Sequence, residues 1–301
     1  MILKAIVFGA VLLFSGFLTT PISTAQGIDE DVRGAFMTTR PKNADKNVNA
    51  TSSARPGRRR PKPVATPDPT PVPKPSDNPG RVKNGKGPKI RTTQLGLGMT
   101  LFARNTNGLA VRVDPAHEFR QGDMVRLLLE TNADGYLYLF NTTNGGQPVL
   151  IYPDPQLDEG GNYIQAHVPF EIPSSVATEE RLRWLAFDEH AGAEKVYVAF
   201  TREPLAGVPV EDELLGFCKA KASNCPLHPD AELWAAIQKE VTAPVAVAKT
   251  KSFGRPQTAR EQQATTRGIG LSKKDPEPSL IMMTTTTNST MLVATLDLIH
   301  K

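Results

Sequence analysis

The residues best placed for chemistry in this sequence lie in one acidic loop, YPDPQLDEGGNY. Asp154, Asp158 and Glu159 supply carboxylates beside glycines that permit tight turns, and Ca²⁺ prefers such oxygen ligands. The same carboxylates suggest a hydrolase in which Asp154 or Asp158 acts as a base. Their spacing does not match an EF-hand loop, and acidic residues beside glycine and proline are ordinary in turns. We therefore expect a turn, with a calcium site or a hydrolase as alternatives.

Other residue patterns typical of catalysis are missing from the sequence. It has no GxSxG elbow, no glycine-rich phosphate loop and no GxGxxG fingerprint, and the glycines of GLG at Gly96–Gly98 are expected only to give a flexible start to a domain. No two histidines stand at metal-ligand spacing, so each is expected at the surface. The histidines are His117, His167, His190, His228 and His300. We expect no enzymatic activity, cofactor or metal.

Two cysteines, Cys218 and Cys225, lie close together in the sequence. In an oxidising compartment two nearby thiols tend to pair. A disulfide that closes so short a loop stabilises the fold by about 2.5 kcal/mol, enough to hold a local turn. Two cysteines fill only half of a tetrahedral zinc shell. A disulfide is therefore expected, with two unpaired thiols as the alternative.

Residues 1–25 have the pattern of an export signal. Lys4 precedes an apolar run from Ala5 to Leu18, and Pro21 and small residues lead to Ala25. The run is shorter than the roughly 20 residues that a membrane-spanning helix needs. We predict cleavage after Ala25, no transmembrane helix in the mature chain, and a location in the periplasm, the cell envelope or outside the cell. An uncleaved anchor is the alternative.

Residues 26–92 are predicted to be a disordered, proline-rich basic linker. Between Thr38 and Arg91 there are fourteen lysines and arginines against three aspartates, although the whole chain carries only +4. The sequence thus allows contact with an anionic polymer, and a solvated spacer is the alternative. The candidate contact residues are Arg55, Arg58, Arg59, Arg60 and Lys62. Nucleic acid is disfavoured as a partner, because no aromatic residues are interleaved with these basic residues.

Residues 93–243 have the pattern of an antiparallel β-sandwich with a helical appendage. Short β-rich runs alternate with turn residues. The expected strands are 99–104, 109–113, 124–131, 136–142, 148–152, 163–172, 181–187 and 195–202. In DGYLYLF, Tyr136, Tyr138 and Phe140 alternate with Leu137 and Leu139, so both faces are apolar and the strand should be central.

Strand 124–131 has a different alternation. Val125, Leu127 and Leu129 share one face, and Arg126 and Glu130 fall on the other. The aromatic residues of the domain either line a binding face or fill the core, and core packing is favoured because a sandwich must fill its interior. They are Tyr136, Tyr138, Phe140, Tyr152, Tyr163 and Trp184.

The C-terminal third is predicted to contain helices, a loop and a pair of strands. One helix is expected over 211–221, and a second starts at the cap Asp230 and ends at Pro244. Residues 244–278 have little apolar content and are predicted to form a flexible loop. Residues 279–301 are apolar again and are predicted to form a β-hairpin that docks on the sheet, with a ragged tail as the alternative.

Three segments, EFRQGDMVRLLLETNADGYLYLFNTTNGGQPVLIYPD, FEIPSS and EKVYVAFTREPL, resemble the family catalogued as Domain of Unknown Function 4384. The similarity covers about Leu95 to Leu205. Its clearest pieces are scaffold motifs, carried by Gly122, Asp123, Gly135, Tyr136, Tyr138, Pro153 and Pro173. The resemblance implies a bacterial β-sandwich accessory module without known catalysis, of a kind often attached to kinases, caspase-like peptidases or envelope proteins.

These observations predict an exported, non-catalytic binding or interaction module of the bacterial cell envelope. Its expected partner is an envelope protein or a polysaccharide, reached through the linker and bound by surface complementarity. The alternatives are a hydrolase or calcium-dependent protein that uses the loop 154–159, and a structural spacer anchored to an anionic polymer.

Overall fold

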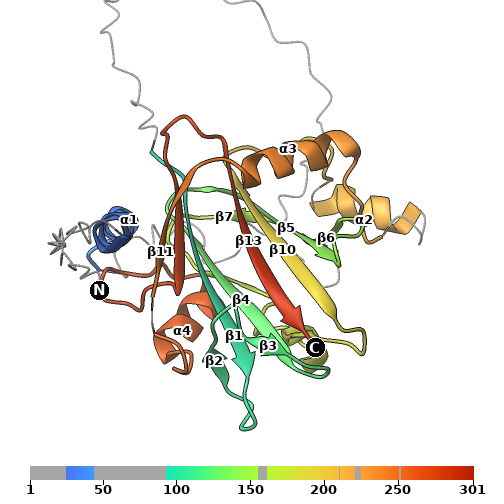
Figure 1. Ribbon diagram of the computed structural model, residues 1–301, viewed down its shortest axis with the longest axis horizontal. Coiled ribbons are helices and arrows are strands. Elements are labelled where there is room, and N and C mark those ends of the chain that lie inside the picture. The colour runs from blue at the N-terminus through green and yellow to red at the C-terminus, as the bar shows by residue number, and fades with distance from the viewer. Residues whose placement is uncertain (1–24, 44–92, 155–160, 210, 221–224, 251) are drawn as a thin grey trace, which may run out of the picture.

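The computed structural model describes residues 25–43, 93–154, 161–209, 211–220, 225–250 and 252–301 (Figure 1). Two β-sheets dominate it, and all strand pairs but one are antiparallel among the described residues, which confirms the predicted mainly-β sandwich. Residues 1–24, the candidate contact residues Arg55 to Lys62, and both Asp158 and Glu159 lie outside the described ranges. Among the described residues, no helix has the length and apolar character needed to cross a membrane.

The first sheet has the strand order β11-β12-β1-β4-β8, with β2 paired to β1 and β9 paired to β4. Its strands are β1 (Gly96–Arg104), β2 (Ala110–Arg112), β4 (Met124–Thr131), β8 (Phe170–Ile172), β9 (Leu185–Ala186), β11 (Val245–Lys249) and β12 (Leu280–Thr284). The second sheet has the order β3-β13-β10-β5-β6, with β7 paired to β5. Its strands are β3 (Glu118–Phe119), β5 (Gly135–Thr143), β6 (Val149–Tyr152), β7 (Tyr163–Ile164), β10 (Gly192–Thr201) and β13 (Met291–His300).

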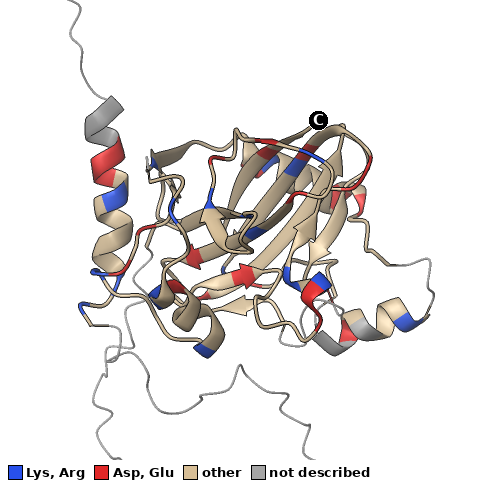
Figure 2. Ribbon diagram, turned by 90° about the horizontal axis from the view of Figure 1, so that it is seen from below, with Lys and Arg blue, Asp and Glu red and all other residues tan. Residues whose placement is uncertain are grey.

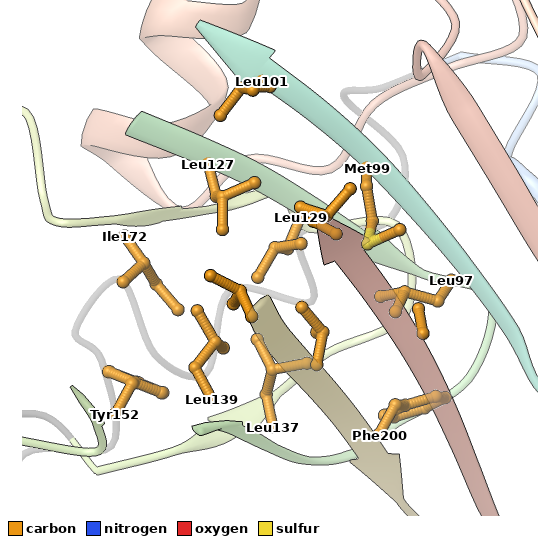
Figure 3. Packing of buried hydrophobic residues seen from close by; sticks show 14 of the residues in the cluster. Leu97, Met99, Leu101, Leu127, Leu129, Leu137, Leu139, Tyr152, Ile172 and Phe200 are labelled. Atoms are coloured by element: carbon orange, nitrogen blue, oxygen red, sulfur yellow. The ribbon is translucent and has the colours of Figure 1, made fainter. Parts of the chain in front are cut away.

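The main core lies between the two sheets, as the alternation of apolar residues predicts. Leu127 and Leu129 of β4 point towards Leu137 and Leu139 of β5, and Phe200 of β10 closes the same cluster (Figure 3). These side chains are at most 2% exposed. Burying a side chain of this size stabilises the fold by roughly 1.5–3 kcal/mol, so this layer supplies much of the driving force for folding.

Close contact of β5 and β10 depends on one glycine. A Cβ atom at Gly135 would overlap the carbonyl oxygen of Thr201 and lie 2.7 Å from Cε2 of Phe200. At the other end of β5, Asn144 and Gly145 adopt positive φ angles of 52° and 69° and reverse the chain, as the sequence predicts.

The outer face of the second sheet is apolar and is covered by α3 (Ala231–Val241). Tyr138 and Phe140 project there from β5, which confirms that this strand is covered on both sides. Figure 1 shows α3 lying over this sheet, and Ile237 of α3 is fully buried in the same apolar cluster. Asp230 caps the helix, since its Oδ1 accepts a hydrogen bond from the Leu233 amide at 2.8 Å.

The helix before α3, α2 (Glu211–Ala220), is joined to the start of the following turn by a disulfide between Cys218 and Cys225. Leu227, two residues after Cys225, is buried in the same apolar cluster that α3 covers. The disulfide therefore attaches α2 to a segment that packs on the second sheet.

The prediction of a linker over 26–92 is wrong for its first part, because residues 25–39 form α1 (Ala25–Thr39). Figure 1 shows α1 beside β11, and Val32 and Phe36 of this helix are buried against residues of β11 and β12. The prediction that Gly96–Gly98 gives a flexible start to the domain is also wrong, since both glycines belong to β1. A Cβ at Gly96 would lie 2.9 Å from Cδ2 of Phe36, and one at Gly98 would lie 3.2 Å from its Cζ. The two glycines form the socket for this ring.

Arg40, just after α1, is the charged anchor of this helix. Its Nε and Nη2 donate to the two carboxylate oxygens of Glu130 in β4, at 2.7 and 2.6 Å. The remaining guanidinium hydrogens go to the carbonyl oxygens of Ser272, Asp275 and Pro276, so all five donors are used. His167 completes the group, with Nδ1 2.8 Å from Glu130 Oε1 and Nε2 2.8 Å from the Thr39 hydroxyl.

Glu130 is ionised in spite of its burial. Burial alone would raise the pKa of this carboxyl, but the hydrogen bonds and charges of His167 and Arg40 outweigh that effect and hold the pKa below its ordinary value. His167 is only 3% exposed and His300 only 5%, so the prediction that every histidine lies at the surface is wrong for these two.

The prediction of a flexible loop over 244–278 is wrong, because this stretch contains β11 and α4 (Ala259–Arg267). Thr258 and Glu261 form a capping box at the start of α4. Glu261 is buried and pairs with Arg112 of β2 at 2.5 Å. The polar residues that suggested a loop are thus the residues that hold α4 on the first sheet.

Three strand predictions also need correction. β12 and β13 are both present at the C-terminal end, but β12 pairs with β1 and β11 and β13 pairs with β10 and β3, so they do not form a hairpin with each other. The strand predicted over 163–172 is split into β7 and β8, which belong to different sheets. The strand predicted over 181–187 is a 3-10 helix, η2 (Glu180–Arg183), followed by β9.

Candidate functional site

The acidic loop predicted from the sequence is described only at its first carboxylate. Asp154 follows β6 and the cis peptide bond between Tyr152 and Pro153. Within the described ranges, no group of three histidine, cysteine, aspartate or glutamate side chains is arranged to hold a metal ion. The described part of the chain therefore gives no geometric support for a calcium site or for a hydrolytic centre at this loop.

The motif residues of the resemblance occupy turns and strand ends. Gly122 has a φ of +86° and donates its amide hydrogen to the Phe187 carbonyl at 2.9 Å. Asp123 caps the same turn by accepting from the Arg120 amide at 2.8 Å. Pro173 follows a cis peptide bond after β8. These positions shape the backbone of the sandwich.

The two tyrosines of DGYLYLF have different surroundings. Tyr138 is buried, and its hydroxyl accepts a hydrogen bond from the Leu205 amide at 2.9 Å. Burial raises the pKa of this phenol above its ordinary value. Tyr136 is half-buried and packs edge-to-face on Tyr163, with 5.3 Å between ring centroids. Tyr163 is 42% exposed, so it is the member of the predicted aromatic set that the solvent reaches most.

A cavity of about 350 Å³ opens on the first sheet, at the end where β1 finishes and β4 begins. Its size falls in the usual range of small-ligand pockets, about 300–1,000 Å³. Its lining combines basic, amide, hydroxyl and apolar side chains. The lining residues are Arg104, Gly108, Leu109, Ala110, Arg126, Ser175, Val176, Glu180, Arg183, Trp184, Gln257, Gln262 and Thr266.

Strand pairing brings these distant residues together. Ala103 pairs with Val125, and Val125 pairs with Leu185, so Arg126 lies beside Trp184 and near the end of β1. The Gln257 amide donates to the Ala110 carbonyl at 2.8 Å, which fixes the segment before α4 on β2. The wall of the cavity therefore contains residues that lie far apart in the sequence.

Arg126 forms the charged part of the cavity wall. It is 5% exposed, and the carbon Cζ of its guanidinium lies 4.1 Å from the centroid of the Trp184 ring. Its Nε donates to the Arg183 carbonyl at 3.0 Å. Its Nη1 lies 3.8 Å from Glu171 Oε1, which is an ion-pair distance but too long for a hydrogen bond. Neither Nη atom has a hydrogen-bond partner among the described residues.

Glu171 lies behind Arg126 and is almost completely buried. Its Oε1 accepts a hydrogen bond from Nε2 of Gln257, whereas its Oε2 is buried without a partner among the described residues. Burial lowers the pKa of Arg126, and the carboxylate of Glu171 offsets part of that effect. An anion bound at the Nη atoms would compensate the guanidinium further.

The rim of the cavity combines an ion pair with exposed aliphatic side chains. Arg104 Nη2 lies 2.8 Å from Glu180 Oε1. Leu109 is 54% exposed and Val176 is 55% exposed, the highest values among the large hydrophobic residues that are exposed in the described part of the chain. Arg183 orders the neighbouring loop, since its Nε donates to the Ala177 carbonyl at 2.7 Å.

Figure 2 shows basic and acidic residues interspersed over the helices, loops and strand ends of this view. Against that mixed background, a cavity wall with three arginines and one glutamate is a local concentration of positive charge. Sequence reasoning considered Trp184 only as one of six aromatic residues and placed Arg126 on the face away from the core. An arginine within the apolar run MVRLLLE was the available signal.

Comparison with other proteins gives a match for one segment of the chain. The chain matches no curated protein and no solved structure. The segment from β3 to the residues after β10 includes six lining residues of the cavity, whereas the remaining lining residues lie outside that segment. The six are Arg126, Ser175, Val176, Glu180, Arg183 and Trp184. This segment, residues 118–204, matches the family model described as Domain of unknown function (DUF4384), which confirms here the resemblance drawn from the sequence motifs.

Proposed function

We propose that this chain is an exported, non-catalytic binding module of the bacterial cell envelope, and that its β-domain binds an anionic ligand in the arginine-lined cavity. The observation that carries the proposal is the state of Arg126. Its guanidinium is buried and lies against Trp184 in the cavity wall, and neither Nη atom has a hydrogen-bond partner among the described residues, although Nη1 forms a long ion pair with Glu171. Charge-assisted hydrogen bonds to such a group are the strong ones in ligand recognition.

Export is supported by two features. The disulfide between Cys218 and Cys225 is typical of an oxidising compartment. The apolar run from Ala5 to Leu18 has the length and flanks of a cleavable signal. The other functions considered from the sequence depend on Asp154, which is described, and on Asp158, Glu159 and the basic residues 55–62, which lie outside the described ranges.

The test uses the two tryptophans of the chain as reporters. Replacing Trp234 with Phe leaves Trp184 as the single indole, so its fluorescence reports directly on the cavity. The purified mature chain is titrated with valine-ended peptides, glucuronate and glycerol phosphate. We expect a saturable, salt-sensitive fluorescence change with at least one of them.

Two variants decide whether the signal comes from the cavity. Arg126→Gln should abolish the change. Arg181→Gln is the control, because Arg181 lies on η2 between the cavity residues Glu180 and Arg183 but is exposed and does not line the cavity. Absence of a saturable response to all three ligands at millimolar concentration would refute the proposal.

A further inference from the structure

We infer that the cavity recognises a peptide that ends in an aliphatic residue with a free α-carboxylate. This inference rests on the proposed binding function and names its ligand class.

The charges of the site fit a singly charged group. Three arginines line the cavity, and Glu180 at the rim and Glu171 behind Arg126 oppose them. The balance leaves one net positive charge. A carboxylate matches this balance, whereas a phosphate monoester, which carries between −1.5 and −2 charges at about pH 7, would be left partly uncompensated.

The free edge of Arg126 fits the planar shape of a carboxylate. Its Nε is already used by the Arg183 carbonyl, so only the two Nη atoms remain for a ligand. Two Nη atoms at one edge of a guanidinium offer parallel N–H donors, which can bind both oxygens of a carboxylate at once.

The rim supplies the apolar part of the recognition. Leu109 and Val176 expose more than half of their surfaces although they lie beside the charged wall. An aliphatic side chain next to the carboxylate would cover both of them. The α-carboxylate of a terminal valine or leucine combines these two groups within one residue.

Trp184, the aromatic residue of the cavity, is less suited to bind a sugar than to line a peptide site. Carbohydrate sites present an open aromatic face on which the ring can stack, but here the guanidinium of Arg126 lies over the Trp184 ring at 4.1 Å. In contrast, the hydroxyls and amides of Ser175, Gln262 and Thr266 are suited to the N–H and C=O groups of a peptide backbone.

The experiment compares four probes on the full mature chain with the Trp184 reporter. They are an acetylated tripeptide ending in valine with a free carboxylate, its C-terminal amide, its glycine-ended counterpart, and glucuronate. We expect the free carboxylate to bind at least about 10-fold more tightly than the amide, because the amide cannot accept two charge-assisted hydrogen bonds. The valine peptide should bind about 10-fold more tightly than the glycine peptide, because valine buries apolar surface on the rim.

Rim variants keep the test independent of folding. Leu109→Ser and Val176→Ser change exposed side chains, and together they should remove the preference for valine over glycine while a weaker carboxylate interaction persists. Arg126→Lys keeps the charge but loses the planar fork, so it should weaken binding of the free carboxylate by about 10-fold. Arg181→Gln should change neither value.

The possible failures are distinguishable. If glucuronate or glycerol phosphate binds in an Arg126-dependent way and the valine peptide does not, the peptide assignment is wrong and the proposed binding function stands. Equal affinity for the free and amidated peptides also overturns the assignment. If no probe binds, both proposals fail together.

Discussion

The two outer faces of the sandwich are sealed in different ways. On the second sheet, α3 covers Tyr138 and Phe140 with the apolar side chains of Leu233 and Ile237. On the first sheet, buried ion pairs of Arg40 with Glu130 and of Arg112 with Glu261 help to hold α1 and α4, in addition to the apolar contacts of α1. Apolar contact is insensitive to pH and tolerant of small shifts, whereas a buried ion pair depends on geometry and on both partners remaining charged. The cover of the first sheet, which we call the polar seal, therefore depends on the protonation state of its charged groups. The cover of the second sheet, the apolar seal, does not.

The largest effect is expected from breaking the polar seal. Arg40→Met leaves Glu130 buried beside His167 without its main partner, which should lower the free energy of unfolding by about 3–5 kcal/mol. Chemical denaturation measures the change. Arg33→Met, within α1, is the control, because the ion pairs of Arg33 with Asp29 and Glu277 are partly exposed and its hydrogen bond to the Lys249 carbonyl is exposed.

A paired replacement sharpens this test. Arg40→Met together with Glu130→Met should regain most of the lost stability, since no buried charge remains unpaired. If Arg40→Met proves no more harmful than Arg33→Met, the view of Arg40 as the anchor of α1 is wrong.

The apolar seal should respond less strongly. Ile237→Ala removes a fully buried side chain from α3 and should cost about 3 kcal/mol at any pH at which the domain is folded. Lys239→Ala, at an exposed position of the same helix, should change the stability by no more than about 0.5 kcal/mol. A cost for Ile237→Ala that varied strongly between pH 4 and about pH 8 would contradict the contrast between the two faces.

The disulfide adds a covalent support to the side of the second sheet. Replacing Cys218 and Cys225 with serine should lower the free energy of unfolding by about 2.5 kcal/mol through the entropy of the unfolded chain. Hydrogen exchange should show lost protection in α2, while α3 keeps its protection because Asp230 and Ile237 still hold it. Unchanged protection in α2 would show that the disulfide does not order this helix.

The smallest and most local effect is expected from acid. The folded pKa of Glu130 lies below its ordinary value of 4.5, so its ion pair contributes full stability above that pH and loses it as the pH falls through the folded pKa. Arg40 and His167 are the hydrogen-bond partners that then face a neutral carboxyl. Below pH 4.5, amides of α1 should exchange faster relative to those of α3, measured by mass spectrometry and corrected for intrinsic rates. Parallel loss of protection in both helices would contradict a selective loosening.

Many strands of the sandwich were predictable because the alternation of residues along a strand indicates which side chains face the core. The run MVRLLLE gave the bounds of β4, and DGYLYLF revealed a strand covered on both faces, since period-two patterns depend only on neighbouring residues. The cap Asp230 and the apolar stripe after it likewise predicted α3.

The helix α1 and the cavity were not predictable for a common physical reason. From the sequence, Arg40 is predicted to be a solvated linker residue, because its partner Glu130 is 90 positions away and only the fold brings the two together. Val32 and Phe36 are too few to form a recognisable apolar stripe. The cavity residues Arg104, Arg126 and Trp184 become neighbours only through the pairing of β4 with β1 and with β9. Charged residues that pair over a long sequence separation produce no periodic pattern by which they could be recognised in the sequence.

The position of β13 has a consequence for how the molecule is made. This strand runs along the whole length of β10 and sends Leu292, Ala294 and Leu296 into the main core, yet it follows α4 in the chain. A growing polypeptide therefore lacks an inner strand of its second sheet until β13 itself, which follows α4 and β12, has been synthesised. Closure over so long a separation is intrinsically slow, and the unpaired side of β10 stays open to solvent or to a chaperone in the meantime. Under the export proposed above, late closure would leave the chain unfolded for longer and so available for transport across a membrane.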